Sequence, residues 1–397
     1  MIKVLYITYE NLFRNPVLQS MVINPLSEIS KKHDVSFIIT SSVKSFERDE
    51  IYKKNKRSTK KLPGLKVIEF EKTMNDKQSY LNFASDIYPV IKKCYDISKQ
   101  VDLIHCRSYG GAIIGFIIHL LTGKPYIYDM RGTFPEETVE IGKISKNSIK
   151  FKMMKIVEKI LIKKSAHVVT VSNKFTDYIV GTFNKKNTTN VNNPTVFKNY
   201  FKQHRKNKEK INFIYSGHVK PWHLPDLTVK YFSKIQKKFP DEVYFYFCTN
   251  ERDVVKNLFD QHNVPSNSYE INTVPYHEMP NYYSKADIAF CFIAESFPRK
   301  ICFPVKFSEY IASNLFVLAN KNIGDVPDII RKYNCGITFQ DLNNVENNIL
   351  EIANVVNLMK SNKFKLYERN DMRFLDWQFE AIDKYYNIYK DILKLND

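Results

Sequence analysis

The chain has 397 residues, of which 44% are apolar and 14% aromatic, and this composition excludes a disordered or low-complexity protein. A chain of this length is expected to form about two or three domains. Lys and Arg outnumber Asp and Glu by 60 to 42, and the excess is uneven. Residues 1–200 contain 33 basic and 18 acidic side chains, whereas residues 201–397 contain 27 and 24. We therefore expect the N-terminal half to contact an anionic partner.

Cysteine usage and hydropathy point to a cytoplasmic protein. The six cysteines are scattered without a CxxC pair, so the sequence predicts neither a zinc site nor a disulfide framework. No signal peptide precedes the first strand-like run. The longest apolar stretch, 112–122, is shorter than the ~20 residues that span a bilayer. We expect a protein that is soluble or bound peripherally to a membrane.

Short apolar runs alternate with helical segments along the first half. Strands are expected at 3–8, 35–40, 65–70, 102–106, 125–129 and 167–171. Helices are expected at 17–32, 80–99, 110–121 and 149–164, with the basic run 52–61 as a flexible loop. Strands that are apolar throughout and alternate with helices predict a parallel sheet covered on both faces.

The same alternation restarts in the second half. Strands are expected at 212–216, 243–248, 268–271, 288–293 and 316–319, and helices at 224–238, 254–262, 279–285, 306–313 and 326–332. A polar, basic segment at 199–210 is predicted to link the two halves. The predicted fold class is α/β, with two Rossmann-like, doubly wound parallel-sheet domains that face a cleft, over residues 1–195 and 196–372.

A final helix is expected over about 377–395, within a C-terminal segment that starts at residue 373. Its apolar residues recur at helical spacing: Phe379, Ile382, Tyr386, Tyr389 and Ile392. This helix lies too far along the chain from the last predicted strand to be a crossover of the second sheet. We expect it to pack back on the first domain.

The most informative segment for chemistry is 303–314, which follows the strand at 288–293. Pro304 and Val305 are placed to begin a helix, whose first backbone N–H groups make an anion site at the end of a parallel strand. Lys306 adds a positive charge, and Glu309, one turn further, can accept bonds from two hydroxyls. This combination suits the diphosphate and ribose of a nucleotide sugar. The alternative is an ordinary helix start with a Lys–Glu pair on the surface.

Two further clusters follow strands in the predicted sheets. After the first strand of the second half, Gly217 permits a close backbone approach and Lys220 can neutralise a phosphate, although a solvated loop with a stacked Trp is the alternative. Asp129 and Arg131 end a strand of the first half. Charges this dense at a strand end are not expected in a core, and we favour a functional role. The polar loop at 107–111 is equally well explained as a contact to a sugar or as a plain turn.

Three stretches together resemble a known family: Asp-Met-Arg-Gly at 129–132, the Pro-x-Lys-x-x-Glu-Tyr-x-Ala pattern within 303–314, and Ile-Gly-Asp-Val at 323–326. The sequence resembles the retaining glycosyltransferases of GT-B architecture, in the broad family 4, and is most similar to members from bacterial capsule and lipopolysaccharide clusters. It departs from the family where Ile301 replaces the first acid of a paired-glutamate motif and where Asn314 replaces a glycine.

The resemblance implies an enzyme that moves a sugar from a nucleoside-diphosphate sugar to a hydroxyl of a glycan or lipid-linked acceptor, in bacterial surface polysaccharide synthesis, with retention of configuration. It implies catalytic roles for Asp129, Arg131, Lys220 and Lys306, and donor contacts at Gly217, His218, Asn250, Val274, Pro304, Val305 and Glu309. Lysines and helix amides would stabilise the leaving diphosphate. No metal or other cofactor is expected, because no Asp-x-Asp motif is present.

Two other functions stay open on the sequence alone. A nucleotide-sugar epimerase would share the two-domain architecture, but it needs acid and base residues that face each other. A nucleic-acid-binding protein would explain the net charge of +18, but the chain has no aromatic-basic recognition motif and its charge is concentrated in one half.

The segment from Lys143 to Lys164 contains eight lysines and one acidic residue. Within it, a stripe of apolar residues recurs at helical spacing: Ile149, Met153, Ile156, Val157, Ile160 and Leu161. A basic amphipathic helix of this kind suits an anionic membrane surface. The alternative is a crossover helix that buries the stripe against the sheet and leaves only its lysines exposed.

Overall fold

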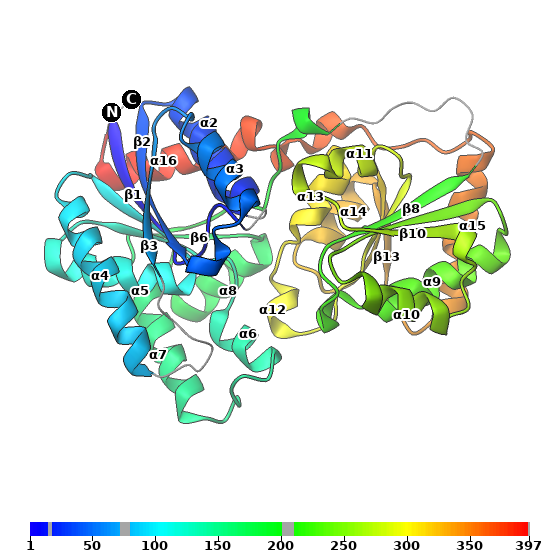
Figure 1. Ribbon diagram of the computed structural model, residues 1–397, viewed down its shortest axis with the longest axis horizontal. Helices are drawn as coiled ribbons and strands as arrows, with labels where there is room; N and C mark the ends of the chain where they lie inside the picture. The colour runs from blue at the N-terminus through cyan, green and yellow to red at the C-terminus, as the bar shows by residue number, and fades with distance from the viewer. Residues whose placement is uncertain (15–17, 72–79, 201–209, 396–397) are drawn as a thin grey trace. The chain divides into compact units, whose positions relative to one another are not determined.

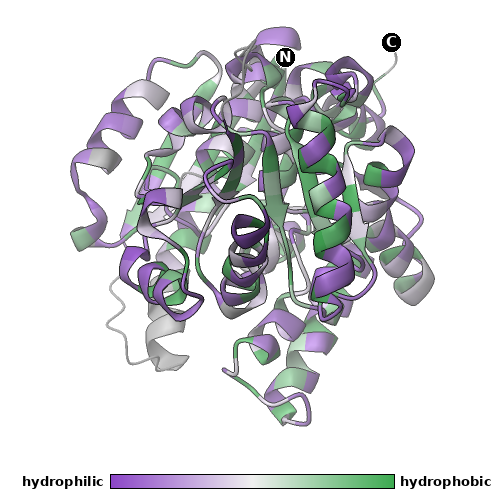
Figure 2. Ribbon diagram, turned by 90° about the vertical axis from the view of Figure 1, so that its right-hand side faces the viewer, coloured by the Kyte–Doolittle hydropathy of each residue, from purple (hydrophilic) through white to green (hydrophobic). Residues whose placement is uncertain are grey.

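In the computed structural model the chain is described throughout except at residues 15–17, 72–79, 201–209 and 396–397. It forms two compact units: Met1–Asn192 together with Trp377–Asp397, and Asn193–Asp376. Each unit is a parallel sheet with helices packed against it (Figure 1). The strands are mostly hydrophobic, whereas many helices carry both hydrophobic and hydrophilic residues (Figure 2).

The sheet of the first unit has seven strands, all parallel, in the order β3-β2-β1-β4-β5-β6-β7. Their bounds are β1 (Ile2–Ile7), β2 (Val35–Val43), β3 (Leu65–Glu71), β4 (Leu103–Arg107), β5 (Tyr126–Asp129), β6 (His167–Thr170) and β7 (Thr188–Asn190). Every residue of the central strands β4 and β5 is buried, as expected for a sheet covered on both faces.

The helical elements of this unit connect the strands. They are η1 (Gln19–Ile23), α2 (Asn24–Lys32), η2 (Ser45–Glu47), α3 (Glu50–Thr59), α4 (Tyr80–Ser98), α5 (Ser108–Thr122), α6 (Phe134–Glu140), α7 (Ile149–Lys164) and α8 (Asn173–Phe183). The segment 52–61, expected as a loop, lies mostly in α3. Its charged composition gives little apolar periodicity, but Asp49 caps the helix by accepting a hydrogen bond from the Tyr52 backbone N–H at 2.9 Å.

The sheet of the second unit has six parallel strands in the order β10-β9-β8-β11-β12-β13. Their bounds are β8 (Ile211–Ser216), β9 (Val243–Cys248), β10 (Tyr269–Asn272), β11 (Ile288–Cys291), β12 (Phe316–Asn320) and β13 (Gly336–Phe339). The order reverses between β8 and β11, as it does between β1 and β4 in the first unit. Loops that follow strands at such a reversal are the usual ligand sites of open parallel sheets.

The α-helices of the second unit are α9 (Pro225–Lys238), α10 (Arg252–Gln261), α11 (Met279–Tyr283), α12 (Phe297–Lys300), α13 (Val305–Ala312), α14 (Val326–Tyr333) and α15 (Val345–Lys360). Short 3₁₀ segments are η3 (Phe197–Asn199), η4 (Pro221–His223), η5 (Ser266–Ser268), η6 (Tyr276–Glu278) and η7 (Arg369–Leu375). The expected strands and helices are present with shifted ends, whereas β7, β13, α3, α6, α8, α12 and α15 were not expected. Most of the basic linker expected at 199–210 lies outside the described residues.

The C-terminal segment belongs to the first unit, where η8 (Trp377–Ala381) and α16 (Ile382–Leu393) follow one another. Asp383 forms an ion pair with Lys32 of α2 at 2.7 Å, and the ring of Tyr386 stacks on His33 at 3.8 Å. The expected apolar face is wrong in part, because Phe379 is exposed and Tyr385 is buried. The π-helical turn of η8 has a longer repeat than an α-helix and so changes which side chains share a face.

No helix in the described part of the chain combines the length and hydrophobicity needed to cross a membrane.

Candidate functional site

The carboxyl ends of β8 and β11 bring the two main predicted motifs of the second unit together. Gly217 follows β8 directly and has a φ of 128°, a conformation that favours glycine. A Cβ atom at Gly217 would lie 3.6 Å from Lys306 Nζ. The exposed backbone of Gly217 and the ammonium group of Lys306 are therefore neighbours at the strand end.

Lys306 is a buried cation near the start of α13, with 9% of its surface exposed. Its Nζ lies 4.1 Å from the centre of the Tyr215 ring and has no hydrogen-bond partner among the described residues. Burial lowers the pKa of Lys306 to about 8. Pro304 is the N-cap of α13 rather than its first helical residue, so the N–H groups of Val305 and Lys306 open the helix. An unpaired ammonium beside these amides is suited to an anion.

Glu309 is also buried, so the alternative of a Lys–Glu pair on the surface does not describe this helix. Its Oε2 accepts a hydrogen bond from the Tyr283 hydroxyl at 2.8 Å, and the hydroxyls of Tyr276 and Tyr200 also donate to the carboxylate. Burial raises the pKa of Glu309, against the opposing effect of these hydrogen bonds. The Tyr283 hydroxyl lies 2.9 Å from Ser216 Oγ, which connects α13 to the end of β8.

The loop after β9 also reaches this end of the sheet. His218 Nδ1 lies 3.1 Å from Glu251 Oε1, and both side chains are partly or largely exposed. Asn250, next to Glu251, is exposed, whereas Val274 in the loop after β10 is partly buried. The side chain of Lys220 is exposed, in contrast to that of Lys306.

Several residues of this region were missed by the sequence-based prediction. The Arg299 guanidinium lies 4.9 Å from the centre of the Trp222 ring, and the Ala294 N–H donates to the Trp222 carbonyl at 2.8 Å. These contacts join the loop after β11 to the loop after β8. Burial, helped by the charge of Lys306, lowers the pKa of His223 to about 3, so this imidazole is neutral. Among Trp222, His223, Ala294 and Arg299, only Trp222 was noted in the sequence, as a ring that could stack within a polar loop.

The structure places Asp129 and Arg131 differently from our expectation, because Asp129 is completely buried at the end of β5. Its Oδ2 accepts a hydrogen bond from Arg131 at 2.6 Å and lies 3.3 Å from His105 Nε2. Burial alone would raise the pKa of Asp129, but the charge of Arg131 and the bond to His105 outweigh it and hold that pKa well below its usual range.

Partners from the C-terminal helix complete this buried cluster. Arg131 donates to the Tyr385 hydroxyl at 2.8 Å, and His105 Nδ1 lies 2.8 Å from the Tyr389 hydroxyl. The hydroxyls of α16 thus give Arg131 and His105 polar partners in the core, whereas Asp129 Oδ1 has no hydrogen-bond partner among the described residues.

Comparison with known proteins supports a function for this arrangement. Residues 196–371, nearly the whole second unit, match the family model described as glycosyl transferases group 1. The second unit is therefore a domain of this glycosyltransferase family, and the chain as a whole has the GT-B fold of two parallel-sheet units. Solved structures show the same fold across the full length: sucrose-phosphate synthase from Thermosynechococcus elongatus has a TM-score of 0.71 at 12% identity, with 100% of each chain covered.

Two further solved structures are similar to this glycosyltransferase. One from Rickettsia africae has a TM-score of 0.70 at 16% identity, covering 100% of this chain and 99% of that chain. HepE of Anabaena, solved in complex with UDP and glucose, has a TM-score of 0.65 at 14% identity and 99% coverage of both chains. No curated protein sequence matches the chain.

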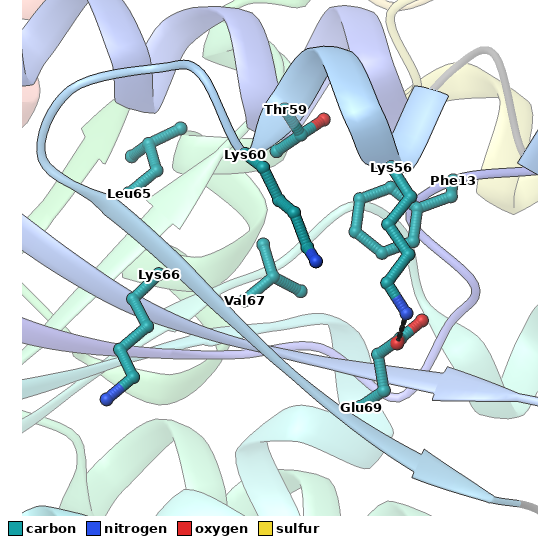
Figure 3. A pocket seen from close by; sticks show the side chains of 8 residues that line it. All are labelled: Phe13, Lys56, Thr59, Lys60, Leu65, Lys66, Val67 and Glu69. Atoms are coloured by element: carbon teal, nitrogen blue, oxygen red, sulfur yellow. Dashed lines mark hydrogen bonds and ion pairs between the residues drawn. The ribbon is translucent and has the colours of Figure 1, made fainter. Parts of the chain in front are cut away.

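The glycosyltransferase also has a pocket in its first unit, between α3 and β3 (Figure 3). Lys56 and Glu69 form an ion pair in its lining, beside Phe13. None of the residues that the sequence predicted as site residues lines this pocket. Gly217, Lys306 and Glu309 belong to the second unit and are not among the lining residues of the pocket.

Proposed function

We propose that this glycosyltransferase takes its sugar from a nucleoside-diphosphate sugar, bound at the carboxyl ends of β8 and β11. The observation that carries the proposal is Lys306: a buried ammonium without a hydrogen-bond partner among the described residues, next to the bare backbone of Gly217. A buried cation costs free energy unless a ligand compensates it. The complex of HepE with UDP and glucose supports this class of donor.

In this proposal the diphosphate accepts hydrogen bonds from Lys306 and from the N–H groups that open α13. The first bond of that helix runs from the Phe307 N–H to the Pro304 carbonyl, so the amides of Val305 and Lys306 precede it. As the bond to the sugar breaks, negative charge grows on the leaving diphosphate, and these preorganised donors stabilise it. Lys220, exposed on the loop after β8, is proposed as the second cation at the diphosphate.

The remaining donor contacts follow from the same strand ends. A carboxylate offers about four acceptor positions, so Glu309 can hold ribose hydroxyls beside its tyrosine partners. His218, Asn250 and Val274 lie on the loops after β8, β9 and β10, and we assign them to the nucleoside. In the first unit, Asp129 is buried at the end of β5. We therefore propose that Asp129 acts by positioning Arg131 and does not itself touch the sugar.

The proposal also covers the acceptor, the anomeric configuration of the product, the metal requirement and the place of the enzyme in the cell. The acceptor is a hydroxyl of a glycan or a lipid-linked glycan in bacterial surface polysaccharide synthesis, and the product retains the anomeric configuration of the donor. Cationic side chains take the role that a metal ion has in other glycosyltransferases, so we expect metal-independent transfer. The enzyme would act in the cytoplasm, at the inner face of the cell membrane. These statements rest on the resemblance to family 4.

Calorimetric titration with UDP and with UDP-, GDP-, CMP- and ADP-linked sugars tests the donor site. One nucleotide class should bind, and Lys306→Met should weaken it at least about tenfold, the loss expected for a desolvated charge-assisted contact. Lys256→Met is the matched control, because Lys256 is exposed on α10 and pairs only at the surface with Asp260 at 3.4 Å. Equal affinity of wild type and Lys306→Met would refute the assignment.

Product analysis separates transfer from epimerisation. A glycosyltransferase releases nucleoside diphosphate in proportion to a glycosylated acceptor, whereas an epimerase converts the sugar without acceptor. NMR of the product gives the anomeric configuration, and activity that persists in a chelator would support metal independence.

A further inference from the structure

The outer face of α7 is apolar and exposed, which reverses the usual pattern of a surface helix. Ile149, Met153 and Ile156 are 77%, 61% and 60% exposed, and Ile160 is 40% exposed. The alternative that this stripe packs against the sheet is therefore wrong. Only Leu161, among the residues expected in the stripe, is buried.

The inner face of the same helix is held by polar contacts. The Tyr109 hydroxyl donates to the Met154 carbonyl at 3.0 Å, and the Tyr126 hydroxyl donates to the Leu161 carbonyl at 2.6 Å. Glu158 is buried and forms an ion pair with Lys155, which also pairs with Glu136 of α6 at 2.9 Å. The helix is thus anchored on the first unit by its inner face, and its apolar stripe is not needed for that anchoring.

The exposed stripe is continuous and bordered by lysines. At 3.6 residues per turn, the five exposed apolar side chains fall within an arc of about 100°. Those side chains are Ile149, Met153, Ile156, Val157 and Ile160. Lys152, Lys159 and Lys163 project along one edge of this arc and Lys150 along the other, and all four are exposed. We call this set of nine side chains the α7 surface.

We propose that the α7 surface docks the enzyme on a bilayer that contains anionic phospholipids. Exposed apolar patches rimmed by polar residues mark interaction sites, because their contact with water is unfavourable. Apolar faces of amphipathic helices enter the boundary between headgroups and acyl chains, and the lysines at the edges of this stripe match the negative charge of the lipid headgroups. The acidic residue of the helix, Glu158, is buried on the opposite face and does not weaken this attraction.

This inference deepens the proposed function, since docking would bring the enzyme to a lipid-linked acceptor. Lipid binding is nonetheless measured without any turnover. Failure of vesicle binding would leave the donor site untouched, and failure of nucleotide binding would leave the α7 surface untouched. The two proposals can therefore be refuted separately.

Co-sedimentation of the full chain with vesicles tests the proposal. We expect binding to vesicles of phosphatidylcholine mixed with an equal amount of phosphatidylglycerol, and at least about tenfold weaker binding to phosphatidylcholine alone. Added salt should weaken the binding to the anionic vesicles, because exposed charges are screened. Equal binding to both kinds of vesicle, or to neither, would overturn the proposal.

Two pairs of variants assign the binding to this surface. Ile156→Glu with Ile160→Glu should reduce binding to anionic vesicles at least about tenfold, because apolar contact is lost and repulsion is added. The matched control is Val254→Glu with Leu350→Glu, since these apolar residues are 52% and 59% exposed on helices of the second unit. The control should bind like wild type, and both double variants should keep the nucleotide affinity of wild type.

A different occupant would give a different result. If the α7 surface were an interface between two copies of the chain, sedimentation velocity would show a dimer that Ile156→Glu with Ile160→Glu dissociates, with no vesicle binding by wild type. That outcome would overturn membrane docking. So would vesicle binding that both double variants retain in full.

Discussion

The ammonium group of Lys306 lies 4.1 Å from the centre of the Tyr215 ring and has no hydrogen-bond partner among the described residues. The aromatic face gives the cation a partial electrostatic partner, but it does not replace the water that burial removes. Burial of this charge is therefore destabilising, and in the proposed donor complex a diphosphate would compensate it. Stability and donor binding should respond in opposite directions to changes at this residue.

Lys306→Met should stabilise the unliganded enzyme while it weakens nucleotide binding. The fall in pKa from 10.5 to about 8 corresponds to about 3 kcal/mol of unfavourable burial, which is the upper limit of the gain. Between pH 8 and 10.5 the unfolded chain binds more protons at this lysine than the folded chain, so this residue makes stability rise with pH. Below pH 8 Lys306 is charged in both the folded and the unfolded chain, so its full unfavourable contribution to the free energy of unfolding remains.

Denaturant unfolding of wild type and Lys306→Met at pH 7 and pH 10 measures this effect. The variant should be more stable at pH 7, and the difference should shrink at pH 10. A variant that is less stable than wild type at both values would contradict the assignment of Lys306 as an uncompensated charge.

The affinity for nucleoside diphosphate should fall as pH rises above about 8. Unliganded Lys306 loses its proton there, whereas a bound diphosphate raises the pKa of Lys306 by favouring its charged form. Binding above pH 8 therefore takes up a proton, and the dissociation constant should rise by up to about tenfold per pH unit. Calorimetry in buffers of different ionisation enthalpy counts this proton directly.

The same titration on Lys306→Met provides the control. Its weaker binding should show no proton uptake in this range. Proton uptake that persists in the variant would assign the pH dependence to another group.

Glu309→Gln should weaken the binding of a ribonucleotide by about tenfold, because a charge-assisted hydrogen bond to a ribose hydroxyl becomes neutral. The sharper measurement compares the nucleoside diphosphate that binds with its 2′-deoxy form. Wild type should prefer the ribonucleotide, and this preference should shrink in Glu309→Gln. An undiminished preference in the variant would show that another residue contacts the hydroxyl.

Tyr283→Phe separates this contact from the fold. It removes the 2.8 Å hydrogen bond to Glu309 and should cost about 1–3 kcal/mol of stability, since the carboxylate is buried. It should leave the preference for the ribonucleotide over its 2′-deoxy form in place, because Glu309 keeps its charge.

The two sheets were largely predictable, because fully buried parallel strands produce apolar runs that repeat along the chain. The helix over 345–360 was missed, although apolar residues recur there at three- and four-residue spacing and gave a usable signal: Val345, Ile349, Ile352, Val356 and Met359. Helix α3 was not predictable in this way, because a cap and charged residues, rather than an apolar stripe, define it.

The environment of the site was less predictable than its residues. The segment 303–314 identified Lys306 and Glu309, but their burial depends on residues from other elements, such as Tyr215 and Tyr283. In the same way, the strand end at Asp129 has the charge pattern of an exposed site. Its burial depends on tyrosines more than 250 residues further along the chain, which no local pattern reveals.

Removing the carboxylate of Asp129 should lower the free energy of unfolding of the first unit more than removing an exposed carboxylate does. Asp129→Ala leaves Arg131 without its 2.6 Å partner inside the protein and should cost about 3–5 kcal/mol. Asp383→Ala is the control, because Asp383 also joins α16 to the rest of the unit, through Lys32, but is 39% exposed. It should cost about 1 kcal/mol or less.

Thermal unfolding of both variants measures the difference, and hydrogen exchange in α16 shows where it arises. Tyr385→Phe offers a milder change if Asp129→Ala does not fold, because it removes only the hydroxyl that accepts from Arg131 at 2.8 Å. That variant should speed exchange in α16 and leave exchange in the second unit unchanged. Equal protection of α16 in wild type and Tyr385→Phe would mean that the buried cluster does not hold the C-terminal helix, and that apolar packing by residues such as Ile388 is sufficient.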